Sequence, residues 1–314
     1  MKVSRTFILG TRGSELALWQ AEYIKSLLEK RVKNISIELK IIKTKGDKIL
    51  DVALSKIGDK GLFTKELENK LLNGEIDFAV HSLKDMETKL DKNLILAAIT
   101  KRHKVNDVII SKRKNLTINK IPLRGKVATG SLRRTAQLLH LRPDIQIFDL
   151  RGNVPTRIQK YLSSNWDAII LASAGVERLN FEENISSTIP KNQMLPAVGQ
   201  GAIAVECRKA DLELIDCLKR INHVKTEVAI RAERAFLKKL EGGCQVPIAA
   251  YGYVESNKLT LIGRILSLDG SISFEQSVDG SVEIPEVLGE KLARNLLAAG
   301  AGKVLAEIKK QSKK

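Results

Sequence analysis

The strongest constraint on the fold is an alternation of short apolar runs with amphipathic helical patterns along the first two thirds of the chain. Residues 7–9 form the first apolar run, and 14–31 has the apolar spacing of a helix with Ser14 as its N-cap. The runs at 76–80 and 168–172 are uninterrupted, as expected of parallel strands buried on both faces. The alternation therefore predicts α/β domains.

The pattern restarts after the charged segment 101–106, which predicts two α/β domains of similar size. A helix over 226–240 then ends at a glycine pair, and three alternating segments follow with short polar turns, which indicates an antiparallel sheet. The expected strands are 7–9, 37–41, 76–80, 108–110, 127–129, 145–150, 168–172, 248–254, 259–266 and 271–278; the expected helices are 14–31, 64–72, 132–141, 154–162, 226–240 and the tail 285–308.

Composition excludes several classes of protein. The chain has 314 residues, 43% of them hydrophobic, which suits a folded protein of two or three domains. Its apolar runs are far shorter than the ~20 residues of a bilayer helix, so we expect a soluble, cytoplasmic protein without a membrane partner. The 3 cysteines lack CxxC spacing and the 4 histidines are scattered, so neither a disulfide framework nor a metal site is predicted.

The formal net charge of +17 leaves three explanations open: a nucleic-acid or membrane partner, an acidic small molecule, or a lysine-rich surface without a specific partner. Nucleic-acid sites interleave aromatic side chains with cations, and only 4% of this chain is aromatic. We therefore expect no nucleic-acid partner.

Arginine placement points to an anionic ligand. These side chains follow apolar strands or open helices, where an open parallel sheet binds its ligands, and guanidinium groups pair bidentately with carboxylate or phosphate. Each of these arginines taken alone is more simply interpreted as a solvated or structural side chain. The set consists of Arg12, Arg133, Arg134, Arg151, Arg157 and Arg178.

A second candidate group follows the run 76–80. Lys84 and Asp85 come just past it, and a carboxylate among cations stays ionised and stabilises a developing positive charge. A surface Lys-Asp pair is an equally good interpretation. We expect His81 to be a packed histidine rather than a catalyst.

Two loops add weaker signals. Glycines and lysines in 44–61 suit a mobile lid, or simply a flexible loop. Cys244 follows a double glycine before a strand, where a thiol is exposed enough to react, unlike Cys207 or Cys217. No phosphate-binding motif of nucleotide sites is present.

Eight segments in order resemble the porphobilinogen deaminase (hydroxymethylbilane synthase) family across about four fifths of the chain. They are TRGSELALWQ (11–20), GDKGLFTKELE (58–68), AVHSLKD (79–85), SLRRTAQL (131–138), DLRGNVPTR (149–157), LASAGVERL (171–179), LPAVGQGAIAVECR (195–208) and LEGGCQVPI (240–248).

The resemblance implies two doubly wound domains like those of periplasmic binding proteins and a smaller α+β domain with a three-stranded antiparallel sheet. The implied boundaries are 1–101 with 201–219 for domain 1, 106–196 for domain 2 and 222–314 for domain 3. It also implies a monomer that carries one covalent dipyrromethane cofactor per chain, as a thioether on Cys244.

The implied reaction is the head-to-tail condensation of four porphobilinogen molecules with loss of ammonia, followed by hydrolytic release of a linear hydroxymethylbilane. Each pyrrole ring carries an acetate and a propionate, which would explain the arginines. Asp85 would contact pyrrole N–H groups and stabilise the cation that forms as ammonia leaves.

The resemblance assigns the remaining residues by position. Cofactor binding falls to Cys244, Lys84, Ser131, Arg133, Arg134 and Ser82; substrate binding to Arg12, Ser14, Arg151, Arg157, Arg178, Gln200 and Phe63; and the lid to Lys56 and Lys60. No metal is implied.

Three motifs depart from the family pattern. Glu87 replaces a proline, Gly130 replaces a serine, and Val105-Asn106 precedes Asp107 where the family usually has proline and arginine. Because Glu87 loosens the backbone and adds negative charge beside a carboxylate site, we predict weaker substrate affinity than with proline. A non-catalytic anion-binding protein of the same architecture is the main alternative, but a mere binder needs neither Cys244 nor Asp85.

Overall fold

The computed structural model describes residues 6–48, 61, 64–242 and 246–311, and these form two compact units. Unit 1 takes its described residues from Met1–Leu50, Asp59–His103 and Gly201–Glu227. Unit 2 takes its own from Lys104–Gln200 and Val228–Lys314. Unit 1 is therefore built from segments that lie far apart in the sequence.

Unit 1 is a five-stranded sheet in the order β2-β1-β3-β10-β4 with helices packed on it. β1 is parallel to both β2 and β3, whereas β10 runs antiparallel between β3 and β4. Its elements are β1 (Thr6–Thr11), α1 (Glu15–Arg31), β2 (Ser36–Ile41), α2 (Lys45–Lys48), α3 (Lys65–Leu72), β3 (Phe78–Ser82), the 3₁₀ turn η1 (Leu83–Asp85), β4 (Leu94–Ile99), β10 (Ile203–Arg208) and α7 (Leu212–Lys219).

Local chemistry explains where α1 begins. The Ser14 side chain accepts a hydrogen bond from the Ala17 amide, which satisfies one of the free N–H groups of the first turn. The buried face of the helix packs Ile24 and Leu28 against the sheet residues Leu9 and Phe78. The cap and this packing together fix the first turn of α1 at the carboxyl end of β1.

Unit 2 contains a second five-stranded sheet, in the order β7-β6-β8-β5-β9. β6, β7 and β8 are parallel, and β5 lies antiparallel to β8 and β9. Its elements are β5 (Asp107–Ile110), the 3₁₀ turn η2 (Ile118–Lys120), β6 (Lys126–Ala128), α4 (Leu132–Leu141), β7 (Gln146–Phe148), α5 (Val154–Leu162), β8 (Ala168–Ala172), α6 (Ser173–Arg178), the 3₁₀ turn η3 (Glu182–Asn184) and β9 (Ile185–Thr188).

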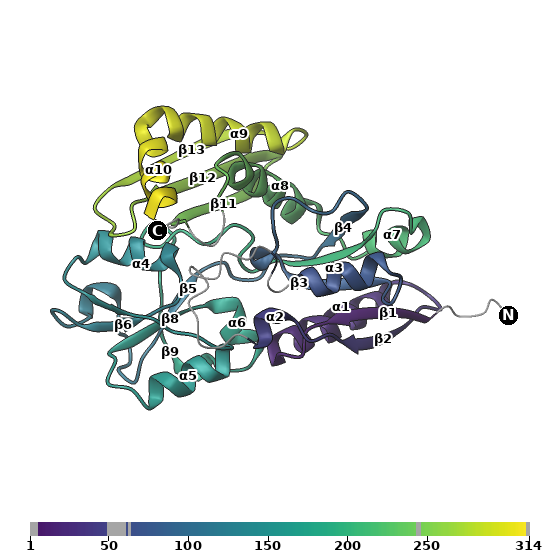
Figure 1. Ribbon diagram of the computed structural model, residues 1–314, viewed down its shortest axis with the longest axis horizontal. Helices are drawn as coiled ribbons and strands as arrows, with labels where there is room; N and C mark the ends of the chain where they lie inside the picture. The colour runs from purple at the N-terminus through teal and green to yellow at the C-terminus, as the bar shows by residue number, and fades with distance from the viewer. Residues whose placement is uncertain (1–5, 49–60, 62–63, 243–245, 312–314) are drawn as a thin grey trace. The chain divides into compact units, whose positions relative to one another are not determined.

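The rest of unit 2 is a three-stranded antiparallel sheet in the order β11-β12-β13, which α9 covers (Figure 1). The elements are α8 (Val224–Lys239), whose first residues belong to unit 1, then β11 (Ile248–Glu255), β12 (Lys258–Leu266), β13 (Ser273–Ser281), α9 (Pro285–Leu296), a π-helical turn η4 (Leu297–Ala301) and α10 (Gly302–Gln311).

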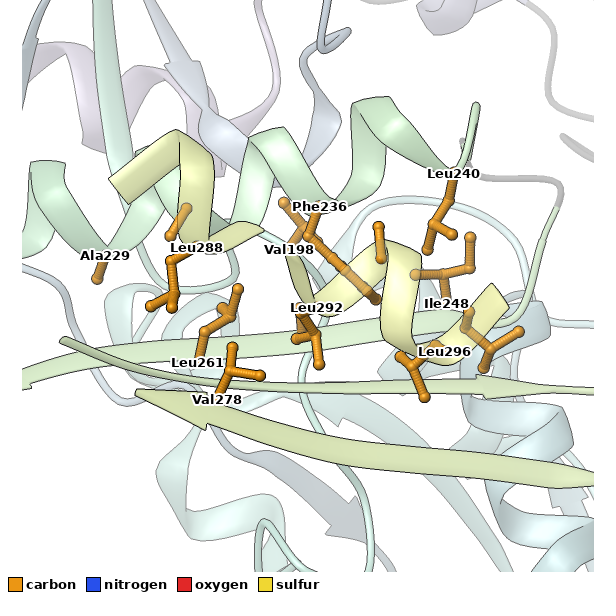
Figure 2. Packing of buried hydrophobic residues seen from close by; sticks show 14 of the residues in the cluster. Val198, Ala229, Phe236, Leu240, Ile248, Leu261, Val278, Leu288, Leu292 and Leu296 are labelled. Atoms are coloured by element: carbon orange, nitrogen blue, oxygen red, sulfur yellow. The ribbon is translucent and has the colours of Figure 1, made fainter. Parts of the chain in front are cut away.

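This last sheet has its own apolar core. Phe236 of α8 and Leu292 of α9 point at the strands, with Leu261 and Val278 beneath them (Figure 2). Gly263 is required at the contact, because a Cβ there would lie 2.8 Å from atoms of both Phe236 and Leu292. Each large side chain buried in this way contributes roughly 1.5–3 kcal/mol.

The α/β class and the separate three-stranded antiparallel sheet are confirmed. The predicted helices 132–141 and 154–162 coincide with α4 and α5, and the strand 168–172 coincides with β8. The run 76–80 is displaced, because β3 begins only at Phe78, after the Asp77 amide has bonded to Ile8. Strands β4, β9 and β10 were not predicted, although two of them occupy apolar runs.

Candidate active site

A pocket lies in unit 1 where the parallel strands β1 and β3 end. Arg12 and Ser14 follow β1, Ser82 is the last residue of β3, and Asp85 closes the turn η1. The lining residues are Arg12, Ser14, Leu16, Ala17, Gln20, Thr64, Val80, His81, Ser82 and Asp85. The structure thus brings together four of the residues that the sequence assigned to catalysis and binding.

The Ser14 hydroxyl can accept one hydrogen bond and donate another. Its hydroxyl oxygen accepts from the Ala17 amide at 3.4 Å, so the hydroxyl hydrogen is left to donate. The nearby Thr11 hydroxyl bonds the carbonyl oxygens of Arg12 and Ala17 and fixes the loop between β1 and α1. A helix N-terminus with a hydroxyl donor and the Arg12 guanidinium beside it favours an anion.

Gln20 belongs to the same pocket, and sequence reasoning missed its role. Its side chain is 2% exposed, and its amide lies within hydrogen-bond distance of the Ser82 hydroxyl, at 2.8 Å from Nε2 and 3.1 Å from Oε1. The signal was available, because Gln20 is a polar residue on the buried face of α1, between Leu16 and Ile24. Gln20 therefore orients Ser82 at the end of β3.

Asp85 and Lys84 lie in η1, which directly follows β3. Asp85 is exposed and lines the pocket, and Lys84 beside it is partly buried. The turn is held by the Met86 amide, which donates to the Leu83 carbonyl at 3.1 Å. The carboxylate therefore stands on a short, hydrogen-bonded turn next to a cation.

His81 precedes Ser82 on β3 and is buried, as expected of a packed histidine. Its Nε2 lies 3.1 Å from Oε2 of Glu206 on the neighbouring strand β10. His81 is also one of the residues that line the pocket with Asp85. Glu206 was not among the predicted residues, because it sits inside an otherwise apolar run.

In unit 2 the predicted arginines Arg133 and Arg134 are buried around one acid, Asp107 at the start of β5. Arg133 Nη2 lies 2.8 Å from Asp107 Oδ2, and Arg134 Nη2 donates to Oδ1 at 2.8 Å. Gln200 Nε2 also donates to Oδ1, at 3.0 Å. Two cations and one anion leave this buried cluster with one positive charge in excess.

Burial and ion pairing have opposite effects on the pKa values of the groups in this cluster. Burial alone would raise the pKa of Asp107, but the charges and hydrogen bonds of Arg133 and Arg134 outweigh it and lower the pKa. Burial also lowers the pKa of the Arg133 guanidinium. Asp107 is therefore ionised at neutral pH, and it holds both arginines by charge.

Both guanidinium groups have further internal partners. Arg133 Nη1 donates to the Leu195 carbonyl at 2.7 Å and Nη2 to Gln200 Oε1 at 3.4 Å. Arg134 Nη1 donates to the Ile170 carbonyl at 3.0 Å. These bonds tie α4 to β5 and β8, so the two arginines have a structural role whatever else they bind.

The other assigned residues of unit 2 stand at the carboxyl ends of its parallel strands. Ser131 is at the N-cap position of α4 after β6, and Arg151 follows β7 with its Nε 3.6 Å from Asp149 Oδ2. Arg157 Nε donates to the Gly152 carbonyl at 2.7 Å, and Arg178 is buried in α6 after β8. Strand ends carry these side chains as the sequence predicted, because parallel strands bring their ends to one edge.

The residues that depart from the family pattern have defined neighbours in the structure. A Cβ at Gly130 would lie 2.5 Å from the Leu150 carbonyl oxygen, so glycine lets the chain after β6 approach the chain after β7. Asn106 Nδ2 donates to the Ile189 carbonyl at 2.9 Å, and Val105 is buried. Glu87 Oε1 would lie 3.2 Å from a Cβ placed on Gly61.

Four assigned residues lie outside the described part of the chain: Lys56, Lys60, Phe63 and Cys244. Their roles stay predictions. Within the described part, no helix combines the length and hydropathy that a bilayer crossing requires, and no group of three or more His, Cys, Asp or Glu side chains is arranged to hold a metal ion.

The solved structures that the chain matches include the methionine binding protein MetQ, with 11% identity, a TM-score of 0.44, and coverage of 69% of this chain and 89% of that one. The periplasmic VFT2 domain of Bordetella pertussis BvgS gives 15% identity and a TM-score of 0.41, over 69% of this chain and 86% of that one.

Family models and curated relatives give a more specific result. The model described as porphobilinogen deaminase, dipyromethane cofactor binding domain, matches residues 7–216, and the porphobilinogen deaminase C-terminal domain matches 228–298. The porphobilinogen deaminase of Moorella thermoacetica is 52% identical, over 98% of this chain and 97% of the relative. That of Syntrophomonas wolfei is 51% identical, over 98% and 100%. With its pocket of arginine, serine and aspartate and with these matches along almost its whole length, the chain belongs to the porphobilinogen deaminase family.

Proposed function

We propose that the protein is a hydroxymethylbilane synthase, which condenses four porphobilinogen molecules head to tail, releases ammonia at each step and frees the linear tetrapyrrole by adding water. The observation that carries the proposal is the pocket in which Asp85, Arg12, Ser14 and Ser82 meet. A carboxylate acceptor for pyrrole N–H groups stands there beside cationic and hydroxyl donors for carboxylates.

The residues present fit a dipyrromethane cofactor. Such a group carries several carboxylates, and the unit 1 pocket supplies Arg12 and the hydroxyl groups of Ser14 and Ser82. Bound as a thioether to Cys244, the cofactor supplies the pyrrole carbon on which the chain is built. Lys84, Ser131 and Ser82 are proposed to bind its carboxylates, together with whatever donors Arg133 and Arg134 have left after pairing with Asp107.

The chain's own residues then have separable tasks. Arg12, Ser14, Arg151, Arg157, Arg178 and Gln200 are proposed to hold substrate carboxylates, with Phe63 packing against rings and Lys56 and Lys60 on the lid. Asp85 accepts hydrogen bonds from pyrrole N–H groups and stabilises the positive charge that develops as ammonia leaves the substrate. Gln20 keeps the Ser82 hydroxyl in position at the pocket wall.

We also propose three domains, 1–101 with 201–219, 106–196 and 222–314, in a cytoplasmic monomer that has neither a nucleic-acid nor a membrane partner. The three separate sheets support this division, since each falls within one of these ranges. Light scattering during size exclusion checks the oligomeric state, because a monomer has a mass of 34.8 kDa plus any covalent group.

Intact mass under denaturing conditions tests the function directly. We expect purified protein to exceed its sequence mass by two linked porphobilinogen-derived rings, and Cys244→Ser to lack this excess and the activity. Cys217→Ser is the matched control, because that thiol is partly buried in α7 and its pKa is raised, so it stays protonated and should leave loading unchanged.

An unmodified protein that stays unmodified and inactive after incubation with porphobilinogen or preformed hydroxymethylbilane would contradict the proposal. A non-catalytic anion-binding protein would then be the better description.

A further inference from the structure

A histidine and a glutamate form a buried pair behind the Asp85 pocket. His81 on β3 faces Ala204 on the antiparallel strand β10, so Glu206, two residues further along β10, is a diagonal neighbour on the same face. The Nε2 to Oε2 distance is 3.1 Å, and the two side chains are 4% and 0% exposed. The sheet register therefore fixes the pair.

The contact sets the tautomer of the ring. An ionised carboxylate only accepts hydrogen bonds, so the hydrogen of a neutral His81 ring must sit on Nε2 and leave Nδ1 as an acceptor. Nδ1 makes no hydrogen bond with any other described residue, and His81 is one of the residues that line the pocket with Asp85. A histidine of the pocket lining is thus held by a buried acid, the arrangement that orients general bases in other enzymes.

Packing does not explain Glu206. Its second oxygen, Oε1, has no hydrogen-bond partner among the described residues, and a buried acid that is only half satisfied is less stable than an apolar side chain of similar size. The pairing of β10 with β4 also shifts register between Val205 and Glu206. Such irregularities re-aim side chains and are frequent beside active sites.

The charged groups around the pair come from several elements. Glu68 projects from α3, and its pKa is raised, chiefly by burial and also by the negative charge of Glu206, which together outweigh the hydrogen bond with Thr64 and the charge of Lys65. Asp85 on η1 and Arg12 after β1 share the pocket lining with His81. The charged groups near His81 are thus Glu206 on β10, Glu68 on α3, and Asp85 and Arg12 among the residues of the pocket.

We propose that His81 is the proton acceptor of the condensation step and that Glu206 is the residue that positions it. The proposal rests on the function proposed above. From the second condensation onward, the α-carbon of the terminal porphobilinogen-derived ring bonds to the methylene carbon that has lost ammonia. The C–H bond of that α-carbon then breaks, and its electron pair returns to the pyrrole ring.

The proton passes to Nδ1 of His81, and the Glu206 carboxylate offsets the charge of the imidazolium. The His81 imidazolium then transfers this proton to the released ammonia, which leaves as ammonium. Atoms and charge balance without a further reactant. Asp85 retains its separate task of stabilising the cation.

The first test reads the ring itself and needs no turnover. Protein with ¹⁵N-labelled histidine gives four ring systems, and His81→Asn identifies the one that belongs to His81. We expect wild type above pH 7 to hold the hydrogen on Nε2, and Glu206→Gln to show a mixture of tautomers. A wild-type ring with the hydrogen on Nδ1 would overturn the proposal.

The second test uses porphobilinogen deuterated at its free α-carbon. Glu206→Gln should lower kcat roughly 10–100-fold with little change in KM, and His81→Asn should lower it roughly 10²–10⁴-fold. The deuterium isotope effect on chain elongation should be larger in both variants than in wild type, because C–H cleavage becomes slower. Glu75→Gln, which alters a surface acid paired with Lys70, should change neither quantity.

An isotope effect equal to wild type in both variants, with kcat falling only in proportion to lost folded protein, would show a structural pair and refute the proposal. If Glu206→Gln fails to fold, His81→Asn alone decides the isotope test. A wild type that carries no covalent pyrrole rings and consumes no porphobilinogen refutes the function instead, and it leaves the tautomer result standing by itself.

Discussion

Two sets of arginines stand at strand ends in this protein, and their surroundings differ. In unit 1, Arg12 is partly exposed and lines a pocket with Asp85. In unit 2, Arg133 and Arg134 are 6% and 5% exposed and share the buried Asp107. The same residue type after a strand end is therefore partly exposed in a pocket in one place and buried around a shared acid in the other.

The largest expected effect is the loss of stability in Asp107→Asn. The substitution leaves two buried guanidinium groups without their counter-charge, and breaking a buried pair in this way costs about 3–5 kcal/mol. Urea unfolding at pH 7.5 measures the change in free energy. Asp144→Asn removes the partner of Arg142 at the surface and should cost far less. Equal losses in the two variants would mean that the buried cluster is not special.

Asp85→Asn should show the opposite profile. We expect kcat to fall roughly 10²–10³-fold, because the stabilising charge beside the departing ammonia is lost, while the free energy of unfolding changes by less than about 0.5 kcal/mol. Steady-state kinetics and urea unfolding on one preparation check both values. The matched control is Asp216→Asn on α7, whose side chain is 76% exposed beside Lys219 and should affect neither. Retained activity in Asp85→Asn would remove this residue from the mechanism.

The same substitution in both regions sharpens the comparison further. Arg133→Lys loses the planar fork that reaches Leu195 and Gln200, and should cost about 1–3 kcal/mol of stability. Arg12→Lys should cost less stability than Arg133→Lys, because Arg12 is partly exposed, and should raise KM for porphobilinogen about tenfold, equivalent to about 1.4 kcal/mol. Thermal unfolding and initial rates distinguish the two outcomes, and a reversed pattern would refute the division of roles.

The smallest effect concerns Glu68 behind the pocket. Because burial raises its folded pKa above the ordinary carboxyl value, the folded state holds this proton longer, and stability falls as pH rises through that window. Glu68→Gln should therefore stabilise the protein at pH 7.5 by about 1 kcal/mol or less, and by nothing near pH 4. Urea titrations at the two pH values measure this difference.

Glu75→Gln is the control of opposite sign. Its hydrogen bond to Lys70 lowers the pKa of Glu75, so this group stabilises the fold above the ordinary carboxyl pKa and loses that effect in acid. The variant should be less stable than wild type at pH 7.5 and equal to it near pH 4. Destabilisation of Glu68→Gln at pH 7.5 would contradict the sign derived for the buried acid.

Much of the fold could be predicted where local chemistry decides it. The predicted helix at 154–162 matches α5, because Asn153 caps it through the Thr156 amide and Pro155 suits its first turn. Strand β10 was missed because hydrophobic periodicity does not reveal that 203–208 returns between β3 and β4. Pairing partners depend on tertiary contacts that no window of sequence contains.

The candidate site divides in the same way. Arg12 and Asp85 could be placed because each comes just after a strand, whereas Ser14 and Ser82 were assigned through the family resemblance. Gln20 and Glu206 were missed, because a polar residue in an apolar pattern is interpreted as part of the core until its partner in the fold is known. Asp107 and Arg134 are 27 residues apart, and only the antiparallel pairing of β5 with β8 brings them together.

The late return of β10 has a consequence for how the protein is made. The ribosome synthesises β3 and β4 long before β10, and at about 5–20 residues per second the intervening hundred or so residues take about 5–20 s. During that interval the two strands that will flank β10 have no central partner, and open strand edges invite pairing with other chains. We expect the nascent N-terminal region to depend on chaperones until residue 208 has emerged, so the slowest and most aggregation-sensitive stage of folding is set by the order of synthesis.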